Sequence, residues 1–420
     1  MNRHAIVLAA DSAATVPYWS EVDQAWKERY FKGANKIFQL SLHHPVGIMI
    51  YGTASLHEVP WEVIVKDFRA RLGDKSFNDV AAYADEFFTF IRNHTHLFPA
   101  DYQSKIFRDE TDKVAFRHLM DVRGDDSVVK AGAEDEKRAA ALALYDRAVA
   151  DIEAIPIAAP FDQGDLDSAL GKYRADVEVE IQKTCIIFDL TWVDAARVAD
   201  LAIRTLFKRP TDLMQVTGVV VAGYGDHDYF PGYHEYQCHG LLLGKFLAKD
   251  VDSRSVSLDT PAQIKAFATT DMVNTFQMGF SPDVFSTVRE ELRKALDSFA
   301  GTLRTELGHA GEIPNLKEHI EVAVKAHTDN WAKAARRAHA WPLLRVIGSL
   351  PVDEMAELAE TLVELQSLKE KVTKPTESVG GPIDVAVISK ADGFIWIKRK
   401  HYFDPALNPR FLARQSRKDA

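Results

Sequence analysis

Apolar runs of strand length open the chain. Residues 5–10 are continuously apolar and end at Asp11, a pattern typical of a strand that is covered on both faces. Residues 36–40 and 46–51 are two further apolar stretches around a short His-His-Pro break, and Gly52 closes the second one. This arrangement predicts a β-hairpin.

Helical spacing follows the hairpin. Apolar positions recur at helical intervals over 59–72, and Ser76 stands where it can cap another helix just downstream. From 94 to 213 the pattern becomes irregular, with an alanine-rich charged stretch at 131–154 that predicts a solvated helix. We therefore expect this region to be a mostly helical insertion.

Strand patterns return in the second half of the chain. Residues 216–222 and 240–247 predict two strands joined by a loop rich in glycine, tyrosine and histidine. Two amphipathic stretches, 284–307 and 316–341, then predict a second helical insertion, because glycine and proline residues separate them.

The end of the chain combines a helix with a hairpin. Pro351 can begin a helix at its first position. Residues 383–388 and 394–397 are apolar stretches around an Asp-Gly pair, and Gly393 can supply the positive φ of a tight turn. We expect an antiparallel hairpin here.

The composition of the 420 residues is that of an ordinary globular protein. Hydrophobic residues make up 46% and charged residues 27%, so the chain can bury a sizeable core. A formal net charge of −10 argues against general affinity for nucleic acid or for an anionic membrane. Only the C-terminal tail is basic, through Arg410, Arg414, Arg417 and Lys418.

The number of cysteines and the length of the apolar runs bear on the cellular compartment that we expect for the protein. Cys185 and Cys238 are far apart in sequence and make no disulfide framework, which favours a reducing environment. No apolar run approaches the length that spans a bilayer, and the N-terminus lacks a signal-peptide pattern. We therefore expect a cytoplasmic protein with no membrane partner.

Three ordered segments resemble the proteasome β-subunit family and its simpler bacterial homologues. Residues 5–15, Ala-Ile-Val-Leu-Ala-Ala-Asp-Ser-Ala-Ala-Thr, resemble the family's opening strand. Residues 35–52 resemble its Lys-Ile strand and the glycine-flanked strand that follows. Residues 351–388 resemble its last helix and its Gly-Gly-x-Ile-Asp-Val-Ala-Val-Ile strand. The order of these segments is more specific than any one of them.

The resemblance implies an α+β fold, the four-layer αββα sandwich of the N-terminal-nucleophile (Ntn) hydrolases, with two helical insertions that a minimal subunit lacks. We expect residues 1–93, 214–283 and 346–403 to form the core, 94–213 and 284–345 to be the insertions, and 404–420 to be a basic tail.

The resemblance also implies a catalytic site. In this family an N-terminal threonine attacks a carbonyl with its hydroxyl, while its own α-amine handles the proton. Lys36 matches the lysine of that site, Asp11 the carboxylate that orients it, and Gly52 the glycine whose backbone N–H stabilises an oxyanion. Each also has an ordinary explanation, as a turn residue or as a solvated lysine before a strand.

Other residues of the family's site have only approximate counterparts. Glu377 and Ser378 lie beside the positions of its auxiliary aspartate and serine, and Thr269 and Asp271 lie near the position of a further serine. A Thr-Thr-Asp helix N-cap is the alternative explanation for 269–271, and it is the one we favour.

Aligning Asp11 and Lys36 with the family places the nucleophile about six residues before Met1. We therefore expect a threonine peptidase or amidohydrolase whose nucleophile lies upstream, because the start site is further upstream or the chain is truncated. It would act on peptide or protein without a cofactor, as a homo-oligomer. The alternative is an inactive scaffold or regulatory protein that docks partners on its helical insertions. The residues do not indicate a substrate or an ATPase partner.

A stretch between two predicted strands gathers possible metal ligands. They are Asp226, His227, Asp228, His234, Glu235, Cys238 and His239. Their spacing matches no zinc pattern, so we expect no metal site. A metal-dependent hydrolase centred on the histidines is a third interpretation.

Overall fold

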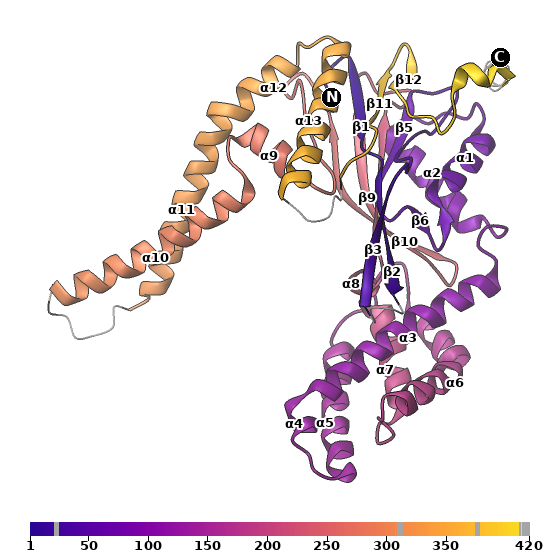
Figure 1. Cartoon of the computed structure of the whole chain (residues 1–420), viewed down its shortest axis with the longest axis vertical. Helices are drawn as coiled ribbons and strands as arrows, with labels where there is room; N and C mark the ends of the chain where they lie inside the picture. Colours follow the sequence, from indigo (N-terminus) through magenta and orange to yellow (C-terminus); the bar gives the residue numbers. More distant parts are fainter. Residues whose placement is uncertain (21–24, 307, 309–313, 374–378, 411–412, 414–420) are drawn as a thin grey trace.

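The computed structural model describes residues 1–420 except 21–24, 307, 309–313, 374–378, 411–412 and 414–420 (Figure 1). The protein is mixed α+β, and the strands of each sheet pair in antiparallel fashion. One sheet has three strands in the order β1-β11-β12, and a second has five in the order β10-β9-β8-β5-β4. The strand pairs β2-β3 and β6-β7 are separate.

The strands are β1 (Ala5–Ala10), β2 (Ala13–Ser20), β3 (Ala25–Lys32), β4 (Ile37–Gln39), β5 (Val46–Gly52), β6 (Ser55–Leu56), β7 (Val59–Pro60), β8 (Thr217–Gly223), β9 (Gly232–Leu242), β10 (Lys245–Ser255), β11 (Asp384–Ser389) and β12 (Gly393–Lys398).

The helices are α1 (Trp61–Leu72), α2 (Val80–Asn93), α3 (Ala100–Gly124), α4 (Asp126–Val129), α5 (Glu134–Glu153), α6 (Gln163–Ile187), α7 (Ala195–Lys208), α8 (Pro210–Leu213), α9 (Asp271–Met278), α10 (Pro282–Glu306), α11 (Leu316–Ala335), α12 (Trp341–Ile347) and α13 (Val352–Thr373), with a π-helical turn at Arg336–Ala340 and a 3-10 turn at Pro405–Leu407.

An apolar layer lies between the two larger sheets. Leu8 of β1 and Ala386 of β11 belong to the same buried cluster as Met49 of β5 and Val220 of β8. Because successive residues of a strand point to opposite faces, each strand also has a second buried set. Ile48, for example, faces the other side of the five-stranded sheet.

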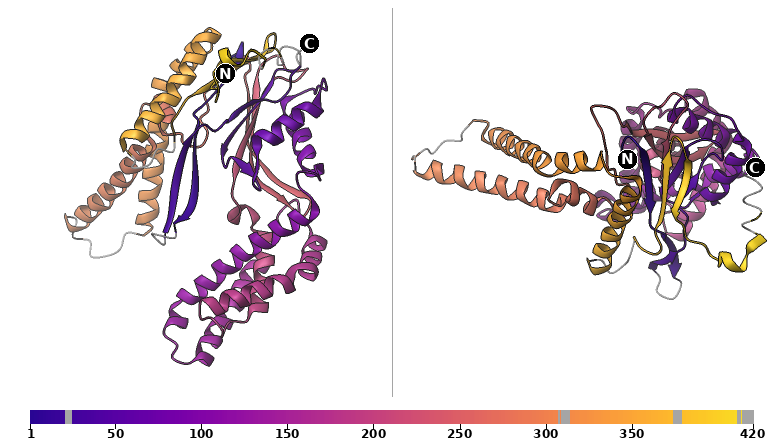
Figure 2. Two further views of the ribbon diagram at one scale, coloured as in Figure 1. Left: turned by 45° about the vertical axis from the view of Figure 1, so that its right-hand side comes forward. Right: turned by 90° about the horizontal axis from the view of Figure 1, so that it is seen from above.

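Helices cover the outer face of each sheet (Figure 2). On the five-stranded sheet, Trp61 of α1 and Phe87 of α2 pack in one cluster with Val221 of β8. On the three-stranded sheet, Met355 of α13 packs with Val387 of β11. Buried apolar contacts of this kind hold the layers together, since each large side chain contributes about 1.5–3 kcal/mol on burial.

The region 94–213 is helical, as predicted, and contains α3 to α8. Helices α3, α5, α6 and α7 share a separate apolar cluster that includes Val114, Tyr145, Val177 and Val198. They form a bundle below the sheets in Figure 1.

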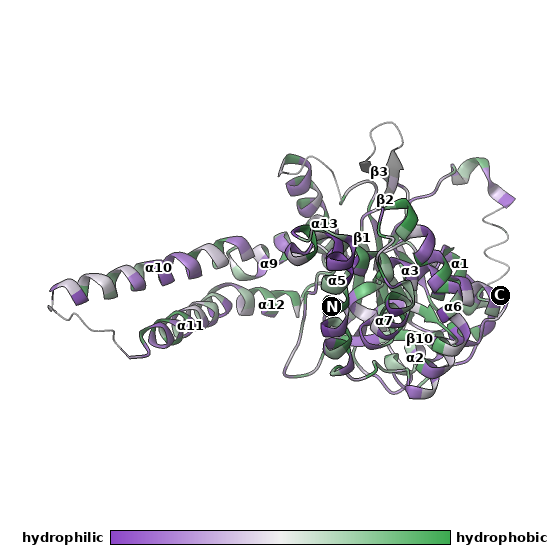
Figure 3. Cartoon of the chain, turned by 90° about the horizontal axis from the view of Figure 1, so that it is seen from below, coloured by the Kyte–Doolittle hydropathy of each residue, from purple (hydrophilic) through white to green (hydrophobic). Residues whose placement is uncertain are grey.

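The second helical region projects from the body of the protein. Helices α10 and α11 lie side by side in both views of Figure 2, and they end far from the sheets. Phe280, Phe285 and Trp331 stack on one another near the base of this hairpin. The predicted helix at 316–341 continues through a π-helical turn into α12. Figure 3 shows hydrophilic and hydrophobic residues interspersed along both helices.

Both predicted hairpins at the two ends of the chain are confirmed. β4 pairs with β5, and β11 pairs with β12 across a turn in which Gly393 has φ 74°. The strand predicted at 240–247 is wrong, because Leu243 and Gly244 form the turn between β9 and β10 with φ of 50° and 80°. The apolar run is continuous there because both strand ends are buried, and residues 232–239 of the loop predicted before it belong to β9.

Two further features differ from the sequence-based expectation. Asp79, not Ser76, caps α2, through a hydrogen bond from the Ala82 N–H, while the Ser76 hydroxyl binds Asp226 at 2.6 Å. The β2-β3 hairpin was not predicted. Among the residues that the structure describes, no helix is long and apolar enough to cross a membrane.

Candidate functional site

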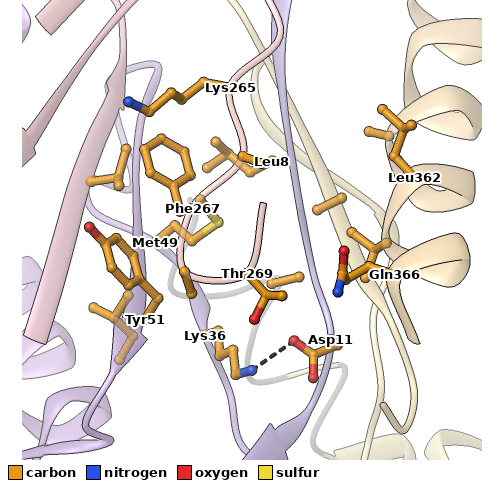
Figure 4. A pocket seen from close by; sticks show the side chains of 18 of the residues that line it. Leu8, Asp11, Lys36, Met49, Tyr51, Lys265, Phe267, Thr269, Leu362 and Gln366 are labelled. Carbon is orange, nitrogen blue, oxygen red and sulfur yellow. Dashed lines mark hydrogen bonds and ion pairs between the residues drawn. The ribbon is translucent and has the colours of Figure 1, made fainter. Parts of the chain in front are cut away.

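Asp11 and Lys36 form an ion pair where β1 ends. The Lys36 Nζ lies 2.7 Å from Asp11 Oδ1, as Figure 4 shows. The other carboxylate oxygen accepts the backbone N–H groups of Ala13 at 3.0 Å and Gly380 at 2.9 Å. Asp11 is only 8% exposed. Because both of its oxygens have fixed partners, the carboxylate holds the lysine ammonium in one place.

Backbone hydrogen bonds bring these two residues together from distant parts of the chain. The Ser12 N–H donates to the Gly380 carbonyl at 3.1 Å, which ties the end of β1 to the segment before β11. The Lys36 carbonyl accepts from the Ile50 N–H at 2.8 Å, which ties the lysine to β5. The ion pair therefore joins the edges of the two larger sheets.

Gly52 ends β5 beside this pair. Its φ is +84°, which favours glycine, and a Cβ added here would lie 2.7 Å from the Val216 carbonyl oxygen. Gly52, Lys36 and Asp11 all line one cavity. The structure thus brings together the three residues predicted as catalytic.

This cavity has a volume of about 650 Å³ and runs along β1. Six consecutive residues, 6–11, line it. Neighbouring residues of a strand point to opposite faces, so contact with all six means that the cavity follows the edge of β1 rather than one of its faces. Its other walls come from β5, the segment 263–269 and α13 (Figure 4). We call this cavity the edge slot.

The first residues of the chain enter the edge slot. The Asn2 N–H donates to the Ala5 carbonyl at 3.0 Å, which turns the chain back beside β1. Met1 pairs with Gln263 through two hydrogen bonds, each of 2.9 Å, from the Met1 amine to the Gln263 carbonyl and from the Gln263 N–H to the Met1 carbonyl. Burial lowers the pKa of the Met1 amine to about 5.

A polar network anchors the far wall of the slot. Lys265 lies 2.8 Å from Asp252 and 3.2 Å from Glu235, and Glu235 accepts the Tyr51 hydroxyl at 2.5 Å. Phe267 stacks on Tyr51 with ring centroids 5.8 Å apart. Burial and the Glu235 carboxylate raise the pKa of Tyr51. Sequence reasoning missed this network, because Lys265 belongs to no motif and Glu235 was considered only as a metal ligand.

Of the residues predicted as auxiliary, Thr269 lies at the edge slot and Asp271 does not. Thr269 lines the slot, and Figure 4 places its side chain near Lys36 and Asp11. Asp271 does not belong to the lining; it starts α9, where Lys369 lies 3.4 Å away. The turn into α9 directs Asp271 towards α13, so the structure does not bring it together with Asp11 and Lys36 in the lining of the slot. Glu377 and Ser378 lie outside the described residues.

The favoured explanation of 269–271 as a helix N-cap is half right. α9 begins at Asp271, but the Thr270 side chain makes no capping hydrogen bond and instead accepts from the Asn274 side chain at 3.0 Å.

The possible metal ligands of β9 and its preceding loop are dispersed. Within the part of the chain that the structure describes, no three His, Cys, Asp or Glu side chains are grouped so that they could hold a metal ion. Asp226 binds Ser76, Glu235 pairs with Lys265 of the slot wall, and Cys238 packs in the core under α1 and α2. Alternation along β9 explains this, since neighbours in a strand face opposite sides.

Comparisons of the chain with protein-family models, curated proteins and solved structures find no match. We therefore base the functional proposal on the geometry of the edge slot together with the resemblance of the three segments.

Proposed function

We propose that this chain is a proteasome-like Ntn hydrolase that cleaves amide bonds in peptides or proteins. The nucleophile in this proposal is the first residue of a strand that precedes Met1 and fills the edge slot. The packing of α1 and α2 on one sheet and α13 on the other is compatible with the four-layer sandwich that this family uses. The ion pair of Lys36 and Asp11 at the end of the slot is the observation that carries the proposal.

The slot has the properties that an added strand requires. β1 is the last strand on one side of its sheet, so half of its backbone hydrogen-bonding groups face away from β11. Such an edge is a template for another strand. Met1 and Asn2 already pair with Gln263 and Ala262 on the opposite wall, so a preceding strand would lie between two backbones.

Antiparallel register supports a position for this first residue. Asn2 pairs with Ala5 across the turn. In an antiparallel pair, each step along one strand is a step back along the other, so the residue numbers of any two facing residues have the same sum, which is seven here. Continuing this pairing places the residue opposite Ala10 about four positions before Met1. The resemblance to the family gives about six positions, within the few residues by which such boundaries are uncertain. Both estimates support a nucleophile beside Asp11 and Lys36.

A hydroxyl or thiol at that point would meet the groups that its chemistry needs. The neighbouring Lys36 ammonium disfavours the protonated form of its α-amine. The amine therefore stays neutral and can take the proton from the nucleophile. The ammonium also stabilises the anionic nucleophile. Asp11 fixes Lys36 in position, and the Gly52 N–H can stabilise the oxyanion that forms when the substrate carbonyl is attacked.

The test begins with the gene lengthened to the next upstream in-frame start. The mature N-terminus is sequenced, and hydrolysis of a panel of fluorogenic peptides is measured. We expect Thr, Ser or Cys at the N-terminus, and a loss of about 10²–10⁴-fold in kcat/KM in Lys36→Ala. Lys66→Ala is the matched control, because Lys66 also pairs with a carboxylate but on the exposed face of α1. Equal activity of both variants would refute the catalytic assignment.

The projecting hairpin of α10 and α11 favours one alternative, a non-catalytic scaffold with the same core. Phe299 is 61% exposed and Val322 is 62% exposed, so the hairpin offers apolar side chains to a partner. A lengthened chain without a hydroxyl or thiol residue at its N-terminus, but with a binding partner lost in Phe299→Ser, would support the scaffold.

A further inference from the structure

An apolar row runs along α10, the first helix of the projecting hairpin. The segments 284–292 and 295–303 both carry an apolar residue at their first, fifth and ninth positions, so the pattern repeats after 11 residues. Eleven residues make about three helical turns, which places the whole row on one side of the helix. The row consists of Val284, Val288, Leu292, Ala295, Phe299 and Leu303. We call it the α10 seam.

The α10 seam is open to solvent. Phe299 is 61% exposed and Val284 is 47% exposed. Among the 25 residues of α10, Ala300 is the only one that is buried. Helices in proteins gain most of their stability from packing, and contact with α11 leaves much of the apolar surface of α10 uncovered. In both views of Figure 2 the hairpin extends away from the sheets, which leaves the seam accessible to another molecule.

The seam matches an antiparallel copy of itself. In an antiparallel pair centred between residues 293 and 294, Val284 faces Leu303 of a second copy. In the same pair, Val288 faces Phe299. A larger side chain thus meets a valine at each end of the seam. Because α10 has 25 residues and is about 37 Å long, antiparallel pairing also keeps the bodies of the two chains apart, at opposite ends.

The charges beside the seam favour the antiparallel direction. Helical spacing places Glu291 and Lys294 near the middle of α10, on the flank of the seam opposite to Ala300. Both side chains are exposed, and they lie 2.9 Å apart in an ion pair. In the antiparallel pair, Glu291 lies beside Lys294 of the second copy, so opposite charges meet. In a parallel pair each residue lies beside its own equivalent, so like charges meet.

We propose that the α10 seam is an interface between two copies of this chain, which pair their hairpins antiparallel into a four-helix bundle. The match of the seam and of its flanking charges with an antiparallel copy favours a second copy over a different protein. The interface lies on a helical insertion and does not include the edge slot. It therefore does not rest on the proposed function, and dimerisation by itself does not decide between hydrolase and scaffold.

Sedimentation equilibrium of the full chain, between about 1 and 200 μM, tests whether the copies pair. We expect a monomer–dimer equilibrium. Phe299→Asp puts a charge into the seam and should weaken dimerisation at least about thirtyfold. Val322→Asp is the matched control, because Val322 is 62% exposed on α11 but lies outside the seam, and this variant should dimerise as the parent chain does. Circular dichroism checks that both variants keep their helix content.

Cysteine cross-linking tests the register and direction of the pair. An oxidised mixture of the Val288→Cys and Phe299→Cys chains should form a disulfide-linked dimer, because these positions face each other. Either variant alone should not, since its two cysteines would lie about 16 Å apart along the pair, too far for a disulfide. The native Cys185 and Cys238 are both buried and do not compete.

Three results would overturn the interface. The first is a chain that stays monomeric up to about 200 μM. The second is association that is unchanged in Phe299→Asp, which would place the contact elsewhere on the chain. The third is cross-linking of Val288→Cys alone as efficient as that of the mixture, which would mean that the helices pair in parallel.

Discussion

The buried amine of Met1 gives a sharp test of the edge slot. In a chain that begins at Met1, burial lowers the pKa of this amine to about 5, from an ordinary value near 8.0. The unfolded chain therefore binds more protons than the folded chain between pH 5 and pH 8, and the free energy of unfolding rises with pH across this window. Below pH 5 the amine is protonated in its buried position, so the free energy of unfolding is lowered by the full amount.

The size of the effect follows from the shift. Three pKa units at 1.36 kcal/mol each correspond to about 4 kcal/mol between pH 8 and pH 5, as an order of magnitude. Acetylation of the amine removes the titration while leaving one N–H to donate to the Gln263 carbonyl. The acetylated chain should therefore lose this part of the pH dependence and keep the pairing of Met1 with Gln263.

Urea unfolding at pH 5, 6, 7 and 8 measures the two chains side by side. Other groups, such as Asp112 with a pKa raised by burial to about 6, titrate in both chains and cancel in the difference. We expect the acetylated chain to be more stable at pH 5, with a gap that closes towards pH 8. If the free energy of unfolding depends on pH in the same way in both chains, the amine is solvated, which would contradict the entry of Met1 into the slot.

Three substitutions test the walls of the site by urea unfolding. Lys36→Met removes the cation beside a buried carboxylate and should cost about 2 kcal/mol, whereas Lys66→Met, at an exposed pair, should cost less than about 1 kcal/mol; equal costs would contradict the ion pair. Gly52→Ala combines a positive φ with a contact of 2.7 Å to a carbonyl oxygen, so it should cost at least about 1 kcal/mol more than Gly73→Ala, where φ is +57° but no atom lies within 4 Å. Tyr51→Phe removes one hydrogen bond of the slot wall and should cost about 1 kcal/mol, and a neutral result would mean that the Lys265 network does not anchor that wall.

Local pattern predicted the elements that surround the site. The apolar run of residues 5–10 and the two terminal hairpins were found because strand length, turn residues and burial agree there. The positions of Asp11, Lys36 and Gly52 came from a resemblance, and the structure places all three on one cavity.

Other features depend on contacts that no local pattern contains. The strand predicted at 240–247 fails because an apolar run looks the same whether or not the chain turns within it. The edge slot is the space enclosed between β1, the segment 263–269 and α13. These segments are far apart in sequence, so no local pattern predicts the slot. Lys265 acquires its role only when β9 and β10 bring Glu235 and Asp252 beside it.

The central claim is that a strand preceding Met1 places a nucleophile beside Lys36. Intact-protein and peptide mass spectrometry of the lengthened chain, treated with a β-lactone that acylates active hydroxyl and thiol groups, tests it most directly. We predict a single adduct on an N-terminal Thr, Ser or Cys about four to six residues before Met1, and no adduct in Lys36→Ala. An unmodified N-terminus, or an adduct that persists unchanged in Lys36→Ala, would contradict the account.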